Sequence, residues 1–519
     1  MSTTNKREKN GKNKWLTIVL IISLGILLML GIIVIAGKSL SSQTTQVATI
    51  IPPVERPFGW VEEEGKWYFY DEKTGEKKSG WLMDQGEQYY LDPITKERVS
   101  GTVQITNEKW YYFDDDGKLY KDCVVDNYVV NKFGYIVDRL MTEHEVQNRL
   151  QELQAGIDEL ASKYGADGVS VALINEGQVT DAFAYGYAQK NVTPMTTETK
   201  IRIASISKVI SSMIGFKMME DGLVDLDAGI GDYWGFPIQN KVYPDHTISL
   251  RYTHTSSIAD LNAYQQIEEK LRQNAVFRNT QPLHPGSCSY CNFAFAVSGA
   301  TLEKAGDKII DDLADEAFFN DLGIDAAFAS GRLQDKSLMA ELYYADGSIA
   351  RSLSTLNNDD GTEIPGKNGS YVVGGLCISA KDLAKLVSIL ANDGMYEGKR
   401  YLEKESIELM ETPFCQTDYH GVEVTQCMPL KYNTDIYGQK SLYFHTGSAY
   451  GVYALMTYNP ATKDGVTVVT TGASGAQDEY GIYALCGDIS ELLYSSLEKD
   501  WRIDLSDQDK LLLGIEESE

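Results

Sequence analysis

The segment Ile201–Ile210 reads IRIASISKVI and places Ser205 and Lys208 three residues apart at the start of an apolar stretch. Residues 201–203 are typical of a short strand, and residues 209–220 are typical of a buried helix. Because residues i and i+3 share one face of a helix, we expect Lys208 to stand beside Ser205. A desolvated lysine has a lowered pKa and can take the proton of a serine hydroxyl. The segment therefore predicts a nucleophilic serine with its own base.

Two further motifs follow along the chain, Tyr290-Cys291-Asn292 and His445-Thr446-Gly447. A tyrosine phenol can relay a proton, and an asparagine amide can hydrogen-bond both a lysine and a substrate carbonyl. The His445 motif, the third along the chain, lies on a predicted strand, and a substrate chain can bind along the edge of that strand. Two other segments match one motif each but not the ordered set. Ser496–Lys499 repeats the serine–lysine spacing in a predicted terminal helix. Lys73-Thr74-Gly75 matches the K-T-G form of the His445 motif, but it lies in a turn long before Ser205.

As an ordered set, the three motifs resemble those of the serine β-lactamase and penicillin-binding superfamily. The resemblance is to its class C β-lactamase-like branch, which includes D-alanyl-D-alanine carboxypeptidases, D-aminopeptidases and esterases. It implies an α+β domain over residues 140–500, in which an antiparallel sheet is flanked by helices and joined to a helical region. The expected elements of this domain are a helix over 143–163, strands over 168–174, 179–187, 450–458 and 466–471, and a last helix over 481–497.

The same resemblance implies a role for each motif residue. Ser205 is expected to be acylated, while Lys208 and Tyr290 share the work of general base and general acid. Asn292 is expected to position Lys208 and the substrate. The remaining expected substrate-binding residues are His445, Thr446, Gly447 and Ser448, with the backbone N–H groups of Ser205 and Ser448 forming an oxyanion hole. The resemblance implies neither a metal nor an organic cofactor.

The third motif begins with His445, where true class C β-lactamases have a lysine. A neutral histidine is a weaker carboxylate anchor than lysine, which favours the peptidase and esterase side of the branch. The leading hypothesis is a serine acyl-hydrolase of cell-wall D-amino-acid peptides, similar to a D-alanyl-D-alanine carboxypeptidase. A β-lactamase or a D-alanyl esterase of the same fold is the enzymatic alternative. A non-catalytic penicillin-binding sensor or wall-adhesion protein is the alternative of another class.

Residues 59–137 contain an internal repeat that recurs at equal spacing, at Gly59-Trp60, Gly80-Trp81 and Gly101-Thr102. An aromatic cluster and an acidic turn follow each pair, which predicts β-hairpins stacked in a solenoid. The pattern resembles the choline-binding and glucan-binding repeats of Gram-positive surface proteins, whose aromatic rings form cation–π cages. A stiff spacer is the alternative. The ligand-binding residues that the resemblance implies, for choline or a wall glycan, are Trp60, Trp67, Trp81 and Trp110.

Residues 15–36 read WLTIVLIISLGILLMLGIIVIA and carry no charged side chain. A helix of this length crosses the ~30 Å hydrocarbon core of a bilayer, and the run exceeds the ~7–15 apolar residues of a signal peptide. We therefore expect a transmembrane anchor over 15–37. The segment 1–14 is basic, so the positive-inside rule predicts a cytoplasmic N-terminus and extracellular, wall-facing C-terminal domains. Residues 38–58 are expected to be a linker and residues 501–519 an acidic tail.

The composition excludes some functions and leaves the cysteines open. The 519 residues have a formal net charge of −27, whereas nucleic-acid binding needs a positive face. Seven cysteines are few for an extracellular chain of this size, so we expect no disulfide framework. Cys415 and Cys427 are near enough in sequence to pair, and Cys288 with Cys291 forms a single C-x-x-C. Buried thiols, a local disulfide and a weak zinc or redox site are the alternatives.

Overall fold

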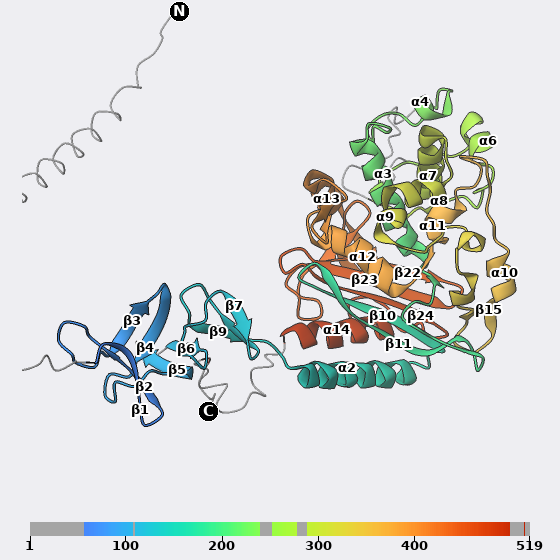
Figure 1. The fold of residues 1–519 in the computed structure, drawn as a ribbon. Coiled ribbons are helices and arrows are strands. Elements are labelled where there is room, and N and C mark those ends of the chain that lie inside the picture. Colours follow the sequence, from blue (N-terminus) through green and yellow to red (C-terminus); the bar gives the residue numbers. More distant parts are fainter. Residues whose placement is uncertain (1–56, 107–108, 239–251, 278–287, 499–512, 514–519) are drawn as a thin grey trace, which may run out of the picture. The chain divides into compact units, whose positions relative to one another are not determined.

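The computed structural model of the chain describes residues 57–106, 109–238, 252–277, 288–498 and 513 (Figure 1). The chain divides into two compact units. One comprises residues 1–101 and 113–119, and the other comprises residues 102–112 and 120–519. The expected limits of linker, repeats, hydrolase domain and acidic tail stay a prediction.

The predicted fold class is corrected in one part, its N-terminal transmembrane helix. Among the residues that the structure describes, no helix is long and apolar enough to cross a membrane. The most apolar of these helices lie buried inside the protein. A helix that is apolar on all sides is stable there, just as it is in a membrane. The segment 15–37 lies outside the described residues, as do residues 1–14, most of the linker and all of the tail except Leu513.

Two hairpins of the first unit carry the predicted repeat. Gly59 and Gly80 adopt φ of +73° and +77°, a conformation that L side chains rarely adopt, so the recurring glycine has a backbone cause. After each hairpin an aspartate, Asp71 or Asp92, accepts N–H groups from the residues two and three positions further on. The paired strands are β1 (Gly59–Glu63) with β2 (Lys66–Tyr70), and β3 (Gly80–Asp84) with β4 (Glu87–Leu91).

The third repeat and the segment that follows it also form small antiparallel sheets. Trp110 packs against Val130 and Ile136, which make a core of only a few side chains. Such a core cannot stabilise a single hairpin, so neighbouring repeats must support one another. The strands are β5 (Gly101–Thr106) with β6 (Lys109–Phe113), and a sheet of β7 (Cys123–Val125), β8 (Tyr128–Val130) and β9 (Ile136–Arg139).

A nine-stranded sheet organises the described part of the hydrolase region, and its strand pairs are antiparallel. Because β10 pairs with β24, strands far apart in the sequence lie side by side. The strands, in their order across the sheet, are β12 (Thr193–Pro194), β11 (Gln178–Gln189), β10 (Gly168–Asn175), β24 (Asp464–Thr471), β23 (Val452–Asn459), β22 (Leu442–Ala449), β21 (Lys431–Asn433), β20 (Val422–Gln426) and β19 (Cys415–Tyr419).

The two faces of this sheet carry separate hydrophobic cores. Along β10, Val171 and Leu173 join one core while Ala172 and Ile174 join the other, because side chains alternate across a strand. One face is covered by α2 (Glu143–Lys163) and α14 (Ala484–Glu498), and the other by α12 (Ala380–Ala391) (Figure 1). This layering confirms the α+β part of the predicted fold class.

A helical region extends from the α12 side of the sheet (Figure 1). Its helices α3 (Ser207–Glu220) and α7 (Asn292–Gly306) bury most of their side chains, which explains why their sequences are apolar all round. The shorter helices of this region and its surroundings are α4 (Gly231–Trp234), α6 (Ile267–Arg272), α8 (Ile310–Ala314), α9 (Asn320–Leu322), α10 (Leu353–Asn357), α11 (Ser370–Gly374) and α13 (Lys404–Glu411). The two-stranded pairs are β13 (Ile201–Arg202) with β16 (Cys377–Ile378), β14 (Leu342–Tyr343) with β15 (Ile349–Arg351), and β17 (Met395–Tyr396) with β18 (Lys399–Arg400).

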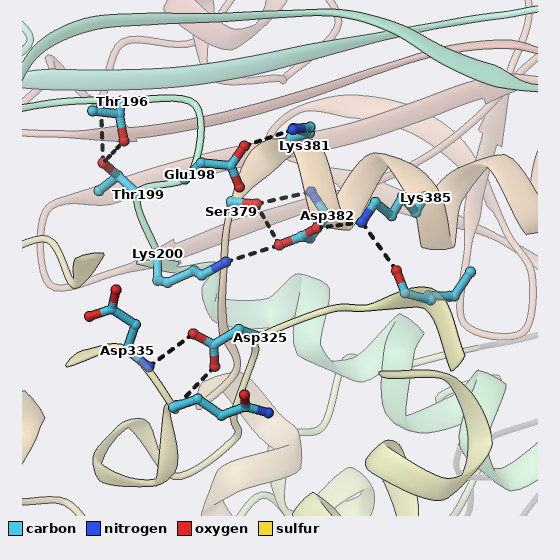
Figure 2. A network of polar contacts seen from close by, with 12 residues as sticks. Thr196, Glu198, Thr199, Lys200, Asp325, Asp335, Ser379, Lys381, Asp382 and Lys385 are labelled. Carbon is cyan, nitrogen blue, oxygen red and sulfur yellow. Dashed lines mark hydrogen bonds and ion pairs between the residues drawn. The ribbon is translucent and has the colours of Figure 1, made fainter. Parts of the chain in front are cut away.

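A buried polar network holds the chain just before Ser205 (Figure 2). Lys200, directly before β13, donates to the carboxylate of Asp382 on α12 at 3.0 Å, and both side chains are almost fully buried. Ser379 and Lys385 also bond this carboxylate. Although burial raises the pKa of Asp382, the charges of Lys200 and Lys385 outweigh it and keep that pKa below the ordinary value. The strand that precedes Ser205 is therefore fixed to the sheet-covering helix.

Candidate active site

Ser205 lies in a single 3-10 turn, Ala204–Ile206, between β13 and α3. Ala204 has a φ of +49°, which is unusual for a residue with a Cβ and marks a sharp turn at the serine. Lys208, the second residue of α3, brings its Nζ within 3.0 Å of Ser205 Oγ. The predicted pairing of these two side chains is therefore present.

The amine of Lys208 is completely buried and lacks an acidic partner among its described contacts. Burial is the largest cause that holds the pKa of Lys208 well below its ordinary value, and the charge of Lys431 is the next. The amine also donates to the carbonyl of Val373, at the end of α11, at 2.7 Å. A neutral amine can give one N–H to this carbonyl and direct its lone pair at the Ser205 hydroxyl. The arrangement suits proton removal from the serine.

Tyr290 completes the group around Ser205. Desolvation raises the pKa of the Tyr290 hydroxyl above its ordinary value, and a hydrogen bond with Ser205 opposes this by less. Lys208 Nζ lies 5.2 Å from the centroid of the Tyr290 ring. With a raised pKa the phenol keeps its proton, so Tyr290 is suited to deliver a proton rather than to remove one.

Asn292 is not among the described hydrogen-bond partners of Lys208, and its expected positioning role stays a prediction. It is the first residue of α7, and the described hydrogen bonds of Lys208 go to Ser205 and Val373, with none to Asn292. Cys291 caps the same helix, since its Sγ accepts the N–H of Ala294 at 3.3 Å. The lysine is therefore held by a backbone carbonyl from a distant helix.

The third motif lies on β22, beside the serine turn. A Cβ on Gly447 would stand 2.2 Å from the carbonyl oxygen of Ile203, so only glycine lets the strand approach this closely. Thr446 Oγ1 is hydrogen-bonded to the hydroxyl of Tyr419. Ser448 is exposed and lines the same cavity as Ser205. The oxyanion-hole roles of the Ser205 and Ser448 N–H groups stay a prediction.

His445 is buried and neutral. Burial, followed by the charges of Lys431 and Lys208, holds the pKa of His445 well below its ordinary value. Its Nδ1 lies 2.7 Å from the carbonyl of Thr446, which can only accept, so Nδ1 carries the proton. Its Nε2 has no hydrogen-bond partner among the described residues and presents a lone pair.

These residues surround a cavity of about 460 Å³. Nine of its lining residues were not predicted from the sequence as parts of the site, among them His254, Tyr419, Lys431 and Tyr483. The ring of His254 contacts that of Tyr290 at 4.4 Å between centroids, with the ring planes tilted by 33°, and its Nδ1 accepts the N–H of Cys291. Lys431 is the first residue of β21, with only 3% of its surface exposed, and burial lowers its pKa to about 8. A lysine in the apolar run MPLKY was the available signal, but no motif marks it.

One disulfide borders the cavity, and it differs from the pairings considered from the sequence. Cys288, two residues before Tyr290, is joined to Cys415 at the start of β19. Cys291 and Cys427 are buried and take part in no disulfide among the described residues. The pairings Cys288–Cys291 and Cys415–Cys427 were wrong, because the fold brings Cys288 and Cys415, 127 positions apart in sequence, to a Cα–Cα distance of 6.4 Å.

Comparison with known proteins agrees with this geometry. Residues 146–485, more than half of the chain, match the family model for beta-lactamase. The chain belongs to the beta-lactamase family. Residues 103–119 match the cell wall binding repeat. The predicted relationship to the serine β-lactamase and penicillin-binding superfamily, preceded by choline-binding-type repeats, is confirmed. No curated protein matches the chain.

Several solved structures share the β-lactamase fold with this chain. A D-amino acid amidase from Ochrobactrum anthropi SV3 is 20% identical, with a TM-score of 0.54 over 68% of this chain and 98% of its own. A penicillin-binding protein homologue from Pyrococcus abyssi is 21% identical, with a TM-score of 0.53 over 69% and 79%. A beta-lactamase/D-alanine carboxypeptidase from Pseudomonas syringae is 16% identical, with a TM-score of 0.52 over 68% and 99%. At these identities the likeness shows the fold alone.

In the repeats, cations of the chain itself lie over the aromatic rings. Arg98 Cζ lies 5.8 Å from the ring centroid of Trp60 and 5.6 Å from that of Trp67. Lys77 Nζ lies 3.2 Å from the centroid of Tyr68. Trp81 is 43% exposed and packs edge-on against Tyr90, while Trp110 Nε1 is buried without a hydrogen-bond partner among the described residues. Internal cation–π contacts thus occupy ring faces in the first repeats.

Proposed function

We propose that the protein is a serine acyl-hydrolase of cell-wall D-amino-acid peptides, acting as a D-alanyl-D-alanine carboxypeptidase through an acyl-enzyme at Ser205. The observation that carries the proposal is the 3.0 Å contact between Ser205 Oγ and the buried amine of Lys208. A lysine with a pKa well below its ordinary value can act as a base at neutral pH. This is the chemistry that a serine nucleophile needs and an adhesion protein does not.

In the acylation step Ser205 Oγ attacks the carbonyl carbon of the substrate and Lys208 Nζ takes the hydroxyl proton. The tetrahedral oxyanion is held by the N–H groups of Ser205 and Ser448. When the C–N bond breaks, the leaving amine receives a proton from Tyr290, which recovers one from Lys208. The products of the step are a Ser205 ester and a free amine, and Lys208 is neutral again.

In the deacylation step a water molecule attacks the Ser205 ester. Lys208 and Tyr290 take the water proton and return a proton to Ser205 Oγ, which regenerates the enzyme and releases a carboxylic acid. The rate of this step separates a hydrolase, which turns over, from a sensor, which stays acylated.

Two observations support a substrate at the cell wall. The family match for the repeats is to a cell wall binding repeat, and one structural neighbour is named for D-alanine carboxypeptidase activity. The Cys288–Cys415 disulfide suits an oxidising, extracytoplasmic environment. We propose that the hydrolase region works on the wall side, held there by the repeats, with choline or a wall glycan as their partner.

Labelling with a penicillin probe tests the nucleophile. Intact-mass analysis of the wild-type chain is expected to show one covalent adduct, which Ser205→Ala abolishes. Ser496→Ala is the matched control because Ser496 begins the second S-x-x-K sequence and its hydroxyl donates to Leu493 within α14. Labelling that survives Ser205→Ala but not Ser496→Ala would contradict the assignment.

A substrate panel tests the reaction. We expect the wild-type chain to release D-alanine from a D-alanyl-D-alanine peptide and to hydrolyse a D-alanyl ester, with little clearance of a cephalosporin. Rapid cephalosporin clearance without peptide or ester turnover would instead identify a β-lactamase. Stable acylation without any turnover would identify a penicillin-binding sensor.

A further inference from the structure

Two arginines share one tyrosine ring just beyond the end of β22. Tyr450 lies in the turn between β22 and β23, two residues after Ser448, and 36% of its surface is exposed. The guanidinium carbon of Arg351 lies 3.8 Å from the centroid of the Tyr450 ring, and that of Arg202 lies 5.2 Å from it. We call Arg202, Arg351 and Tyr450 the arginine clamp. None of the three belongs to a catalytic motif.

The backbone holds the clamp together from separate segments. Tyr450 has a φ of +54°, a conformation that a residue with a Cβ adopts at an energetic cost and that is found most often at functional sites. A Cβ on Gly451 would stand 1.9 Å from the carbonyl oxygen of Tyr343, so β14 packs directly against this turn. Since β15 pairs with β14, its last residue, Arg351, reaches the ring.

Arg202 connects the clamp to the turn of the nucleophile. It lies on β13, three residues before Ser205, and its Nε donates to the carbonyl of Gly374 at 2.5 Å. A Cβ on Gly374 would stand 3.4 Å from the carbonyl carbon of Ala204, so this glycine packs on the serine turn. The residue before it, Val373, carries the carbonyl that holds the buried lysine base. The clamp therefore adjoins the reacting groups.

The clamp carries two positive charges that no described carboxylate balances. Neither arginine forms an ion pair with a described residue, and the hydrogen bond of Arg202 goes to an uncharged carbonyl. The described arginines that do form ion pairs are Arg139, Arg149, Arg272, Arg332 and Arg400. Two like charges on one ring repel each other, although the chain as a whole has a net charge of −27. Their unpaired state beside the nucleophile indicates that an anion is received there.

The direction of the substrate follows from Tyr290. In the proposed reaction Tyr290 gives a proton to the leaving amine, so the leaving group lies in the cavity that Tyr290 lines. The described lining of this cavity includes no residue of the clamp. A substrate whose carbonyl lies between Ser205 and Ser448 therefore extends its other part, the acyl part, along β22 toward Tyr450.

Resting on the proposed function, we propose that the arginine clamp binds a negatively charged group in the acyl part of the substrate. It would select peptides that carry a side-chain carboxylate shortly before the scissile bond. Guanidinium groups hold a carboxylate by parallel N–H···O bonds, and the Tyr450 ring keeps the two groups in place. This assigns specificity on the acyl side, which carboxypeptidase activity alone leaves open. An uncharged acyl part, or one that ends in a free ammonium group, lacks the partner that the clamp requires.

A matched pair of peptides tests the clamp in the full chain. The pair is N-acetyl-glutamyl-D-alanyl-D-alanine and N-acetyl-glutaminyl-D-alanyl-D-alanine, which share their leaving group and differ by one charge in the acyl part. We expect the wild type to release D-alanine from the glutamyl peptide with a kcat/KM about tenfold higher, the range of a hydrogen bond to a charged group. Arg351→Met is expected to reduce this preference to less than about twofold. Arg351→Lys keeps the charge and is expected to restore part of it.

The chain offers a matched control at another stacked arginine. The guanidinium of Arg272 lies 4.0 Å from the centroid of the Phe236 ring, but it is paired with Glu268 and stands outside the clamp. Arg272→Met is expected to keep the wild-type preference. A purely structural role of Arg351 would lower the rates for both peptides together and leave their ratio unchanged. An unchanged ratio in Arg351→Met would therefore overturn the assignment.

Peptide binding to Ser205→Ala gives a readout that does not need turnover. We expect calorimetry to show that the glutamyl peptide binds more tightly than the glutaminyl peptide, and that adding Arg351→Met removes the difference. Absent Ser205-dependent turnover with an intact binding difference would reject the proposed function and keep the clamp. Ser205-dependent turnover with equal binding of the two peptides would keep the proposed function and reject the clamp.

Discussion

At the scale of single residues, the environment of Lys208 decides its chemistry. Its Nζ is shared between Ser205 Oγ at 3.0 Å and the Val373 carbonyl at 2.7 Å. The carbonyl fixes the amine without adding a counter-charge, so desolvation can lower its pKa. A carboxylate in the same place would have kept the lysine charged.

This arrangement predicts unequal effects of two substitutions. Lys208→Met is expected to slow acylation of Ser205 by about 10²–10⁴-fold, because the base is lost. Asn292→Ala is expected to cost less than about tenfold, because the described contacts of Lys208 do not include Asn292. Acylation rates with the penicillin probe, followed by intact mass, measure both. Equal losses would show that Asn292 holds the lysine during the reaction.

The second lysine predicts a pH dependence. Burial lowers the pKa of Lys431 to about 8, so its ammonium is present below that pH. Lys431 also lowers the pKa of Lys208, after burial itself. In Lys431→Met the pKa of Lys208 should therefore rise, and the acidic limb of the pH profile of kcat/KM for release of D-alanine should move to higher pH. A purely structural role of Lys431 would not shift this limb.

At the scale of elements, the ion pair between Lys200 and Asp382 links β13 to α12 (Figure 2). Removing Asp382 leaves the buried ammonium of Lys200 without this counter-ion, so Asp382→Asn is expected to lower the free energy of unfolding by about 3–5 kcal/mol. Lys381→Met is the control, since its pair with Glu198 is about half exposed and is worth less than ~1 kcal/mol. Urea denaturation measures both. Similar small losses would show that the buried pair is not needed to hold the strand before Ser205.

The cations over the repeat hairpins make a prediction about ligand binding. Arg98→Gln with Lys77→Gln frees ring faces of Trp60, Trp67 and Tyr68, so retention on a choline resin is expected to increase. Lys73→Gln, in an exposed turn, is the matched control. Strong retention of the wild type with no gain in the double variant would show that choline binds elsewhere on the repeats.

At the scale of the whole molecule, one covalent bond connects regions distant in sequence. The Cys288–Cys415 disulfide closes a loop across 127 positions and joins the segment before Tyr290 to β19. Replacing both cysteines by serine is expected to lower the free energy of unfolding by about 2–5 kcal/mol in the chain-entropy account. Cys123→Ser, at a free and partly exposed thiol, is expected to have little effect. Equal denaturation midpoints for all three proteins would show that the bond is not formed.

The sequence by itself was enough for every feature that depends on local spacing. The helix over 143–163 and the serine–lysine contact follow from helical periodicity, and the hairpin repeats follow from a glycine with positive φ at equal intervals. The superfamily follows from three short motifs in order. An apolar run of the right length was not sufficient in the same way, since composition alone does not separate a buried helix from a membrane span.

Only the tertiary structure decided which distant residues meet around Ser205. The Val373 carbonyl that bonds Lys208 is 165 positions away along the chain, and the two cysteines of the disulfide are 127 positions apart. Lys431 lines the cavity of Ser205 from the distant strand β21. No local sequence pattern marks these contacts. The reason is physical: a pKa and an ion's partner depend on burial and on neighbours, which chain folding assembles. The sequence therefore placed Ser205 and Lys208 side by side, and the fold decided which distant group, the Val373 carbonyl, also holds the lysine.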